Sequence, residues 1–71
     1  MLAGISFNQL KAAVKSVRLG SVMAEVVLEL PDGQQIVSAI TRGSAEELNL
    51  KQEGAVLAVI KSTGVMVGKD V

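Results

Sequence analysis

The chain has 71 residues, with seven lysines plus arginines against seven aspartates plus glutamates, and it contains no cysteine, histidine, tryptophan or tyrosine. It therefore lacks the usual ligands of zinc, haem, copper and iron–sulfur clusters, and it has neither a thiol nor a serine–histidine–aspartate relay for catalysis. Zero net charge and a single aromatic residue also argue against nucleic-acid binding, so we expect a small, neutral domain that is not an enzyme.

Aliphatic residues dominate the composition, and hydrophobic residues make up 49% of the chain. A domain of this length buries only about 60% of its unfolded surface, and no disulfide or metal supports this one. Association would bury the surplus aliphatic surface, so we expect a homo-oligomer. We also expect a cytoplasmic protein without a membrane partner. The N-terminus has no signal-peptide pattern, no apolar run approaches the ~20 residues of a membrane span, and the lack of cysteine is consistent with the cytosol.

Residues 9–18 predict the first strand, because apolar and polar residues alternate along them. Leu10 and Val14 share one face of this strand. Val17 breaks the alternation, which predicts a β-bulge near Ser16. A tight turn is expected directly after the strand, at the Leu-Gly-Ser sequence.

Residues 22–30 predict the second strand, with aliphatic side chains facing inward and two glutamates facing outward. The inward set is Ala24, Val26, Leu28 and Leu30, and the outward set is Glu25 and Glu29. An acid–base pair is one interpretation of the two glutamates, but their spacing is that of a solvated strand face, which we favour. The sequence Pro-Asp-Gly at 31–33 predicts a turn, with residues 34–42 as the hairpin partner.

The second half of the chain predicts one helix and two further strands. The sequence from Ser44 to Glu47 matches a capping box, in which Ser44 caps the helix and Glu47 reaches back to its amide. The helix should end near Asn49. Residues 55–61 predict a fourth strand, buried on both faces by the barrel or by a neighbouring subunit, and residues 65–67 a brief fifth strand. This order predicts a mainly β fold, a small five-stranded OB-like barrel with one short helix between strands 3 and 4.

Two groups of hydrogen-bond donors are candidates for holding an anion. Thr41 and Ser44 lie where a strand runs into a helix N-terminus, at which amides and the helix dipole favour negative charge. Lys61, Ser62 and Thr63 follow the fourth strand and offer an ammonium, two hydroxyls and turn amides. Such donors suit a tetrahedral oxyanion. The alternative is structural: Ser44 is only a helix cap, and residues 62–64 are only a turn.

Together these segments resemble the molbindins, the Mop domains that also occur as TOBE regions of molybdate transporters and regulators. The resemblance runs from about residue 5 to residue 67, and the order and spacing of six stretches carry it. These are Asn8–Lys11, Gly20–Leu30, Ala39–Thr41, Ser44–Leu50, Ala58–Thr63 and Val65–Val67. The resemblance implies a single Mop/TOBE-like domain over residues 1–71, assembled as a hexamer (a trimer of dimers). Such assemblies bind molybdate or tungstate between subunits for intracellular storage or homeostasis, with no cofactor, no metal held as a cation and no catalysis.

The resemblance also implies which residues bind the oxyanion, and one usual donor is missing. The matching positions are Ser6, Asn8, Thr41, Ser44, Lys61 and Ser62. Family members usually open with Ser-Ala-Arg-Asn-Gln or Ser-Gly-Arg-Asn-Lys. Aligned on Asn8, this chain has Ile5 at the serine and Phe7 at the arginine; a one-residue slip restores Ser6 but not the arginine. A guanidinium binds an oxyanion bidentately, so its loss is expected to weaken the site.

Three hypotheses follow from the sequence. The first is an oligomeric binder of molybdate or tungstate. The second is a Mop-like regulatory or assembly module that has lost or weakened its oxyanion site, as Phe7 permits. The third is an OB-type nucleic-acid binder, which the neutral charge and the single aromatic residue disfavour.

Overall fold

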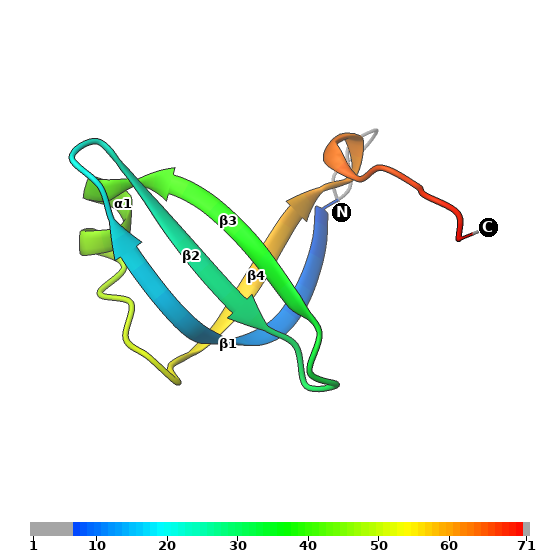
Figure 1. The fold of residues 1–71 in the computed structure, drawn as a ribbon, viewed down its shortest axis with the longest axis horizontal. Coiled ribbons are helices and arrows are strands. Elements are labelled where there is room, and N and C mark those ends of the chain that lie inside the picture. The colour runs from blue at the N-terminus through cyan, green and yellow to red at the C-terminus, as the bar shows by residue number, and fades with distance from the viewer. Residues whose placement is uncertain (1–6, 71) are drawn as a thin grey trace.

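The computed structural model describes residues 7–70, which form a four-stranded antiparallel sheet and one short α-helix (Figure 1). The elements are β1 (Phe7–Leu19), β2 (Met23–Glu29), β3 (Gln35–Thr41), α1 (Arg42–Glu47), β4 (Ala55–Lys61) and the 3-10 helix η1 (Ser62–Gly64). The strand order is β3-β2-β1-β4. The first half of β1 pairs with β4 and the second half with β2, so the sheet curls into a half-barrel. The prediction of a mainly β, OB-like fold with a helix between strands 3 and 4 is confirmed.

The bulge predicted near Ser16 is confirmed. Val14 pairs with Leu28 and Ser16 pairs with Val27, so β1 carries one extra residue at this point. A bulge bends its strand and increases the local twist, and here it lies just beyond the place where β1 leaves β4 for β2. Val17 is an odd number of residues after Val14, so without the bulge the two side chains would face opposite ways. Because of the extra residue, Val17 pairs with Val26 and its side chain packs against the core.

The predicted hairpin between β2 and β3 is also confirmed. The amide of Gly33 donates to the carbonyl of Leu30 at 2.9 Å, and Gly33 has a φ of 93°, which glycine adopts without strain. The Asp32 carboxylate accepts hydrogen bonds from the side chain of Gln34 and from its backbone amide, the latter at 3.2 Å. These two hydrogen bonds hold the pKa of Asp32 below its ordinary value.

The core lies on the concave face of the half-barrel. Val14 has no exposed surface, and Val26, Leu28 and Ala58 pack with it as one buried cluster. The inward positions predicted for β2 are therefore confirmed, except that Leu30 is only half-buried. Ile36, Ile40, Leu50 and Val56 pack against this cluster from its rim.

The prediction of a fifth strand at residues 65–67 is wrong for the described residues, and the barrel of the same chain does not bury both faces of β4; its burial by a neighbouring subunit stays a prediction. Residues 65–67 follow η1 without pairing with any strand of residues 7–70, so the structure has four strands rather than five. β4 is buried on one face only: Ala58 is 5% exposed, but Leu57 and Val59 on the other face are 55% and 57% exposed. In both cases apolar strand-forming residues are present, but nothing within residues 7–70 covers them.

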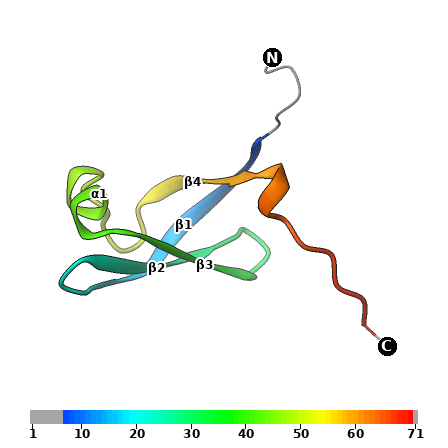
Figure 2. The same ribbon diagram turned by 90° about the horizontal axis from the view of Figure 1, so that it is seen from above.

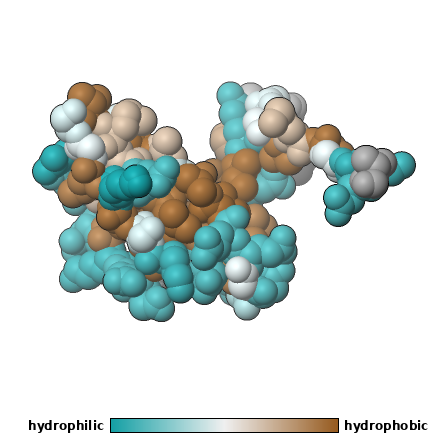
Figure 3. Space-filling model, viewed as in Figure 1, coloured by the Kyte–Doolittle hydropathy of each residue, from teal (hydrophilic) through white to brown (hydrophobic). Residues whose placement is uncertain are grey.

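The chain exposes more surface than a closed domain of its mass. Its accessible area is 5741 Å², whereas a compact monomer of 7.4 kDa exposes about 4200 Å². Its radius of gyration is 13.4 Å, against about 11 Å for a compact chain of this length. Much of the exposed surface is apolar, and Figure 3 shows an apolar band across the half-barrel. Between residues 7 and 70, no helix is long and apolar enough to cross a membrane.

Candidate functional site

The described candidate residues fall into two clusters. The β4-end cluster consists of Asn8, Lys61 and Ser62, where β1 begins and β4 ends; the helix cluster consists of Thr41 and Ser44, where β3 ends and α1 begins. Ser6 lies outside the described residues.

The two clusters lie at opposite ends of the chain's fold. β1 starts beside the end of β4, with Phe7 paired to Lys61, and finishes beside the start of β2. The start of β2 is in turn paired with the end of β3, where Met23 faces Thr41. Figure 1 accordingly shows α1 and η1 at opposite sides of the molecule. A single chain therefore does not bring all of the candidate residues into one site.

The helix cluster is built around Thr41, which caps α1. The Thr41 hydroxyl oxygen accepts from the Ser44 amide at 3.1 Å, and the hydroxyl donates to Ser44 Oγ at 2.8 Å. The prediction that Ser44 caps the helix, with Glu47 reaching back, is wrong. β3 stays paired with β2 through Thr41, and the Arg42 amide donates to the carbonyl of Val22 at 2.8 Å, so the chain turns into the helix three residues earlier.

Capping determines what the helix cluster can offer a ligand. The Ser44 amide is already used by Thr41, so it is not a free anion donor. Ser44 Oγ accepts a hydrogen bond in this arrangement, which leaves the serine's own proton available to donate. The adjacent Arg42 is engaged as well: Nη1 donates to the carbonyl of Gly20 at 3.2 Å, and Nε lies 3.3 Å from Glu46. Arg42 thus holds α1 against the loop after β1.

Replacing Thr41 with valine tests this capping role. Loss of an N-cap hydroxyl typically costs about 1 kcal/mol, which lowers the melting temperature of a domain this small by about 4–8 °C. Thr41→Ser keeps the hydroxyl and should melt within about 2 °C of the native chain. Both variants are measured by circular dichroism at equal protein concentration. Equal melting temperatures for the valine and serine variants would show that the hydroxyl does not stabilise the helix.

The β4-end cluster offers an ammonium, an amide and a hydroxyl, all exposed. Asn8 Nδ2 donates to the carbonyl of Ile60 at 3.4 Å, which ties the amide to the end of β4. Lys61 and Phe7 are directly paired across the two strands and so share a face of the sheet. Side chains at such positions begin about 5 Å apart. An arginine in place of Phe7 would therefore lie next to the Lys61 ammonium, whereas this chain places an aromatic ring there.

The acidic residues show no comparable grouping. Among residues 7–70, no three acidic side chains gather in a way that could hold a metal cation. Glu29 lies 4.0 Å from Lys15, and both side chains are more than one-third exposed, as expected for a solvated strand face.

The family model described as TOBE domain matches residues 7–67. The chain belongs to the TOBE domain family. This TOBE domain is 48% identical over 60 residues to Molybdenum-pterin-binding protein 1 of Clostridium pasteurianum, a match that covers 84% of this chain and 88% of that protein. It is 41% identical over 63 residues to a probable molybdenum-pterin-binding protein of Haemophilus influenzae, covering 89% and 91% of the two chains.

A solved structure confirms the fold relationship. The molybdate-binding protein from Sporomusa ovata superposes on this TOBE domain with a TM-score of 0.82 and 39% sequence identity, over 87% of this chain and 91% of that one. The resemblance to Mop proteins predicted from the sequence is thereby confirmed. The matched residues 7–67 include both clusters, whereas the candidate Ser6 lies just before them.

Proposed function

We propose that this TOBE domain binds molybdate or tungstate between the subunits of a homo-oligomer, with the hexameric, trimer-of-dimers arrangement expected from the family. The observation that carries the proposal is the separation of the two candidate clusters at opposite ends of one chain. A site that uses both clusters needs the β4-end cluster of one copy and the helix cluster of another. Its relatives are named for binding molybdate or molybdenum-pterin.

The donors present suit an oxyanion. Lys61 provides a positive charge, while Asn8, Ser44 and Ser62 provide neutral donors. Hydrogen bonds from an ammonium to an anionic oxygen are about twice as strong as those between neutral groups, so Lys61 is the principal contact in this proposal. We include Ser6 as a further donor, since it directly precedes Phe7 at the same end of the chain.

The proposal extends to how the chain works in the cell. We propose that residues 1–71 form a single Mop/TOBE-like domain that stores or buffers the oxyanion in the cytoplasm without catalysis and without a cofactor. The exposed surface supports the oligomer, because the total accessible area exceeds that of a compact monomer of this mass by about 1500 Å², whereas a standard interface takes only about 800 Å² from each partner.

A second candidate function is an assembly module whose oxyanion site is weakened, and Phe7 opposite Lys61 favours it. Replacing Phe7 with arginine separates the two functions. The new guanidinium would lie beside Lys61 and add a charge-assisted contact, which is expected to tighten molybdate binding by about 10- to 100-fold. Titration calorimetry with molybdate, and with sulfate for comparison, measures this change. Phe7→Leu, which keeps an apolar side chain, is the matched control.

The outcomes of this titration distinguish the binding function from the assembly module. Molybdate binding by the native chain, tightened in Phe7→Arg and unchanged in Phe7→Leu, supports the binding function. A native chain that binds no molybdate, together with a Phe7→Arg variant that does, identifies an assembly module with a decayed site. If neither protein gives a molybdate heat above that of sulfate, the oxyanion function is wrong.

A further inference from the structure

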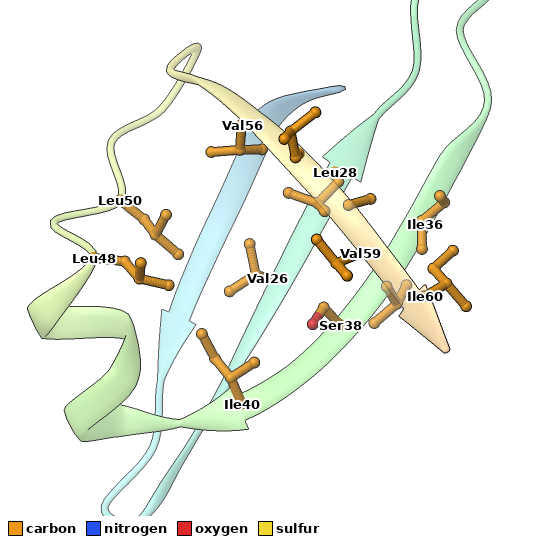
Figure 4. Close-up of a pocket in the computed structure, with 13 residues that line it drawn as sticks. Val26, Leu28, Ile36, Ser38, Ile40, Leu48, Leu50, Val56, Val59 and Ile60 are labelled. Atoms are coloured by element: carbon orange, nitrogen blue, oxygen red, sulfur yellow. The ribbon is translucent and has the colours of Figure 1, made fainter. Parts of the chain in front are cut away.

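The outer face of the paired strands β1 and β4 combines positive charge with exposed apolar side chains. Val56 of β4 packs against the core (Figure 4), and successive side chains of a strand point to opposite faces. The odd-numbered residues of β4 therefore lie on the outer face, and their partners in β1 share it. We use the name outer strip for five residues of this face: Phe7, Lys11, Leu57, Val59 and Lys61.

The outer strip carries two lysines and no acidic residue. The paired segments 7–13 and 55–61 contain no aspartate or glutamate. Among residues 7–70, neither Lys11 nor Lys61 takes part in an ion pair. The other strip residues are apolar and open to solvent: Phe7 is 45% exposed, Leu57 55% and Val59 57%. The two cations are thus flanked by hydrocarbon rather than by carboxylates.

Lys61 has apolar neighbours on two sides. Phe7 is its directly opposed partner, so their side chains begin about 5 Å apart. Val59 lies on the same face of the same strand, two residues earlier and about 7 Å away. The start of β1 and the end of β4 lie side by side in both views (Figures 1 and 2). An anion bound to Lys61 at this end of the sheet therefore shares its surroundings with an aromatic ring and a valine.

Apolar neighbours of a binding cation discriminate between anions by the water that each anion must give up. The cost of taking an ion out of water rises with its charge and falls with its size, and hydrocarbon cannot replace the lost hydrogen bonds. Sulfate and molybdate are both tetrahedral dianions, but sulfate is smaller and holds its water more tightly. Perrhenate is a tetrahedral oxyanion close to molybdate in size with a single negative charge, so it gives up water most easily of the three.

We propose that Phe7 and Val59 make the site at Lys61 select large, weakly hydrated oxyanions, so that perrhenate binds in preference to sulfate although it carries less charge. The proposal rests on the oxyanion binding of the proposed function and adds what determines its selectivity. When a second copy covers the site, these side chains exclude water from the side of the ammonium on which the anion binds. Phe7 is then a specificity-determining residue in addition to the place of a missing donor.

Competition calorimetry tests this selectivity. Molybdate is titrated into the native protein alone, with sulfate and with perrhenate, at constant ionic strength, and perrhenate should displace molybdate at a lower concentration than sulfate does. Phe7→Gln admits water beside Lys61 without changing the charge. It is expected to lower the preference for perrhenate over sulfate by about three- to tenfold. Phe7→Leu keeps an apolar side chain and should retain most of the preference.

A matched control and a direct titration make each result decisive. Val37→Gln makes an apolar-to-polar change on β3, at a valine that is 63% exposed and outside the outer strip, and should not alter the preference. Size-exclusion chromatography checks that all variants keep the native assembly. Sulfate that displaces molybdate as well as perrhenate does, or an equal loss of preference in Phe7→Gln and Phe7→Leu, would overturn the selectivity while molybdate binding stands.

A native chain that gives no molybdate heat would instead count against the proposed function. Perrhenate and sulfate are then titrated directly into the native and Phe7→Gln proteins. Perrhenate binding that weakens in Phe7→Gln would support the selectivity of the strip without molybdate. No binding of either anion would overturn the selectivity together with the proposed function.

Discussion

Lys61→Met is expected to weaken molybdate binding by about 10- to 100-fold, because removing one charged hydrogen-bond donor costs about 1.5–3 kcal/mol. Lys61 lies at the exposed end of β4 and is the one cation among the described candidate residues. Lys61→Arg keeps the charge and should stay within about fivefold of the native affinity. Titration calorimetry at constant ionic strength measures both variants, and circular dichroism checks that their folds are unchanged.

A matched control separates the loss of a specific contact with Lys61 from the loss of one positive charge anywhere on the chain. Lys51→Met removes the same charge from the exposed turn between α1 and β4, at a residue that belongs to neither cluster. If attraction by overall charge dominated, Lys51→Met and Lys61→Met would weaken binding equally. Equal losses would therefore remove Lys61 from the site, even if molybdate still binds.

Val14→Asp is expected to leave most of the chain unfolded at 25 °C. Val14 has no exposed surface, lies opposite Leu28, and is fixed by two backbone hydrogen bonds: its amide donates to Gly54 at 3.0 Å and its carbonyl accepts from Glu53 at 2.7 Å. The change loses about 1.5–3 kcal/mol of apolar burial and buries an unpaired carboxylate at a cost of several kcal/mol more. Together these approach the whole stability of a domain of this length, which is about 4–10 kcal/mol.

Far-ultraviolet circular dichroism and urea unfolding measure this loss. Val22→Asp makes the same chemical change in the exposed turn between β1 and β2, where the valine is 70% exposed, and should change the free energy of unfolding by less than about 0.5 kcal/mol. A Val14→Asp chain that keeps a cooperative unfolding transition near the native midpoint would show that the core is not centred on Val14.

Local chemistry allowed much of the fold to be predicted from the sequence. The β2–β3 hairpin follows from Pro31, Asp32 and Gly33, whose backbone preferences act within four residues. The bulge after Val14 follows from the one point at which the apolar alternation changes phase. Both patterns consist of residues that are neighbours in the sequence, so each can be recognised without knowledge of the rest of the structure.

The predictions that were wrong depended on partners distant in sequence. Two residues, Thr41 and Ser44, could each cap the helix, and pairing of β3 with β2 through Thr41 decides between them. Residues 65–67 have the composition of a strand, but a strand exists only where another edge accepts it, and no strand of residues 7–70 pairs with them. No pattern within one chain tells whether that edge belongs to the same copy.

The arrangement of the candidate site also depends on contacts between residues that are distant in sequence. Lys61 and Asn8 are 53 residues apart, and the pairing of β1 with β4 brings their strand ends together. The separation of this cluster from Thr41 and Ser44 is not visible in the sequence, because it depends on which strands pair with the two ends of β1. The resemblance to the Mop family nevertheless pointed to this separation. It implied sites shared between subunits, and such sites can combine residues from different ends of the protomer.

Native mass spectrometry with and without molybdate tests the central claim most directly, since it reports the size of the assembly and its bound anions together. We predict a hexamer that gains the mass of molybdate in discrete steps, does not do so with equimolar sulfate, and releases bare monomers when collisionally dissociated. A monomer in both conditions, or a hexamer whose mass is the same with molybdate and with sulfate, would contradict oxyanion binding between subunits.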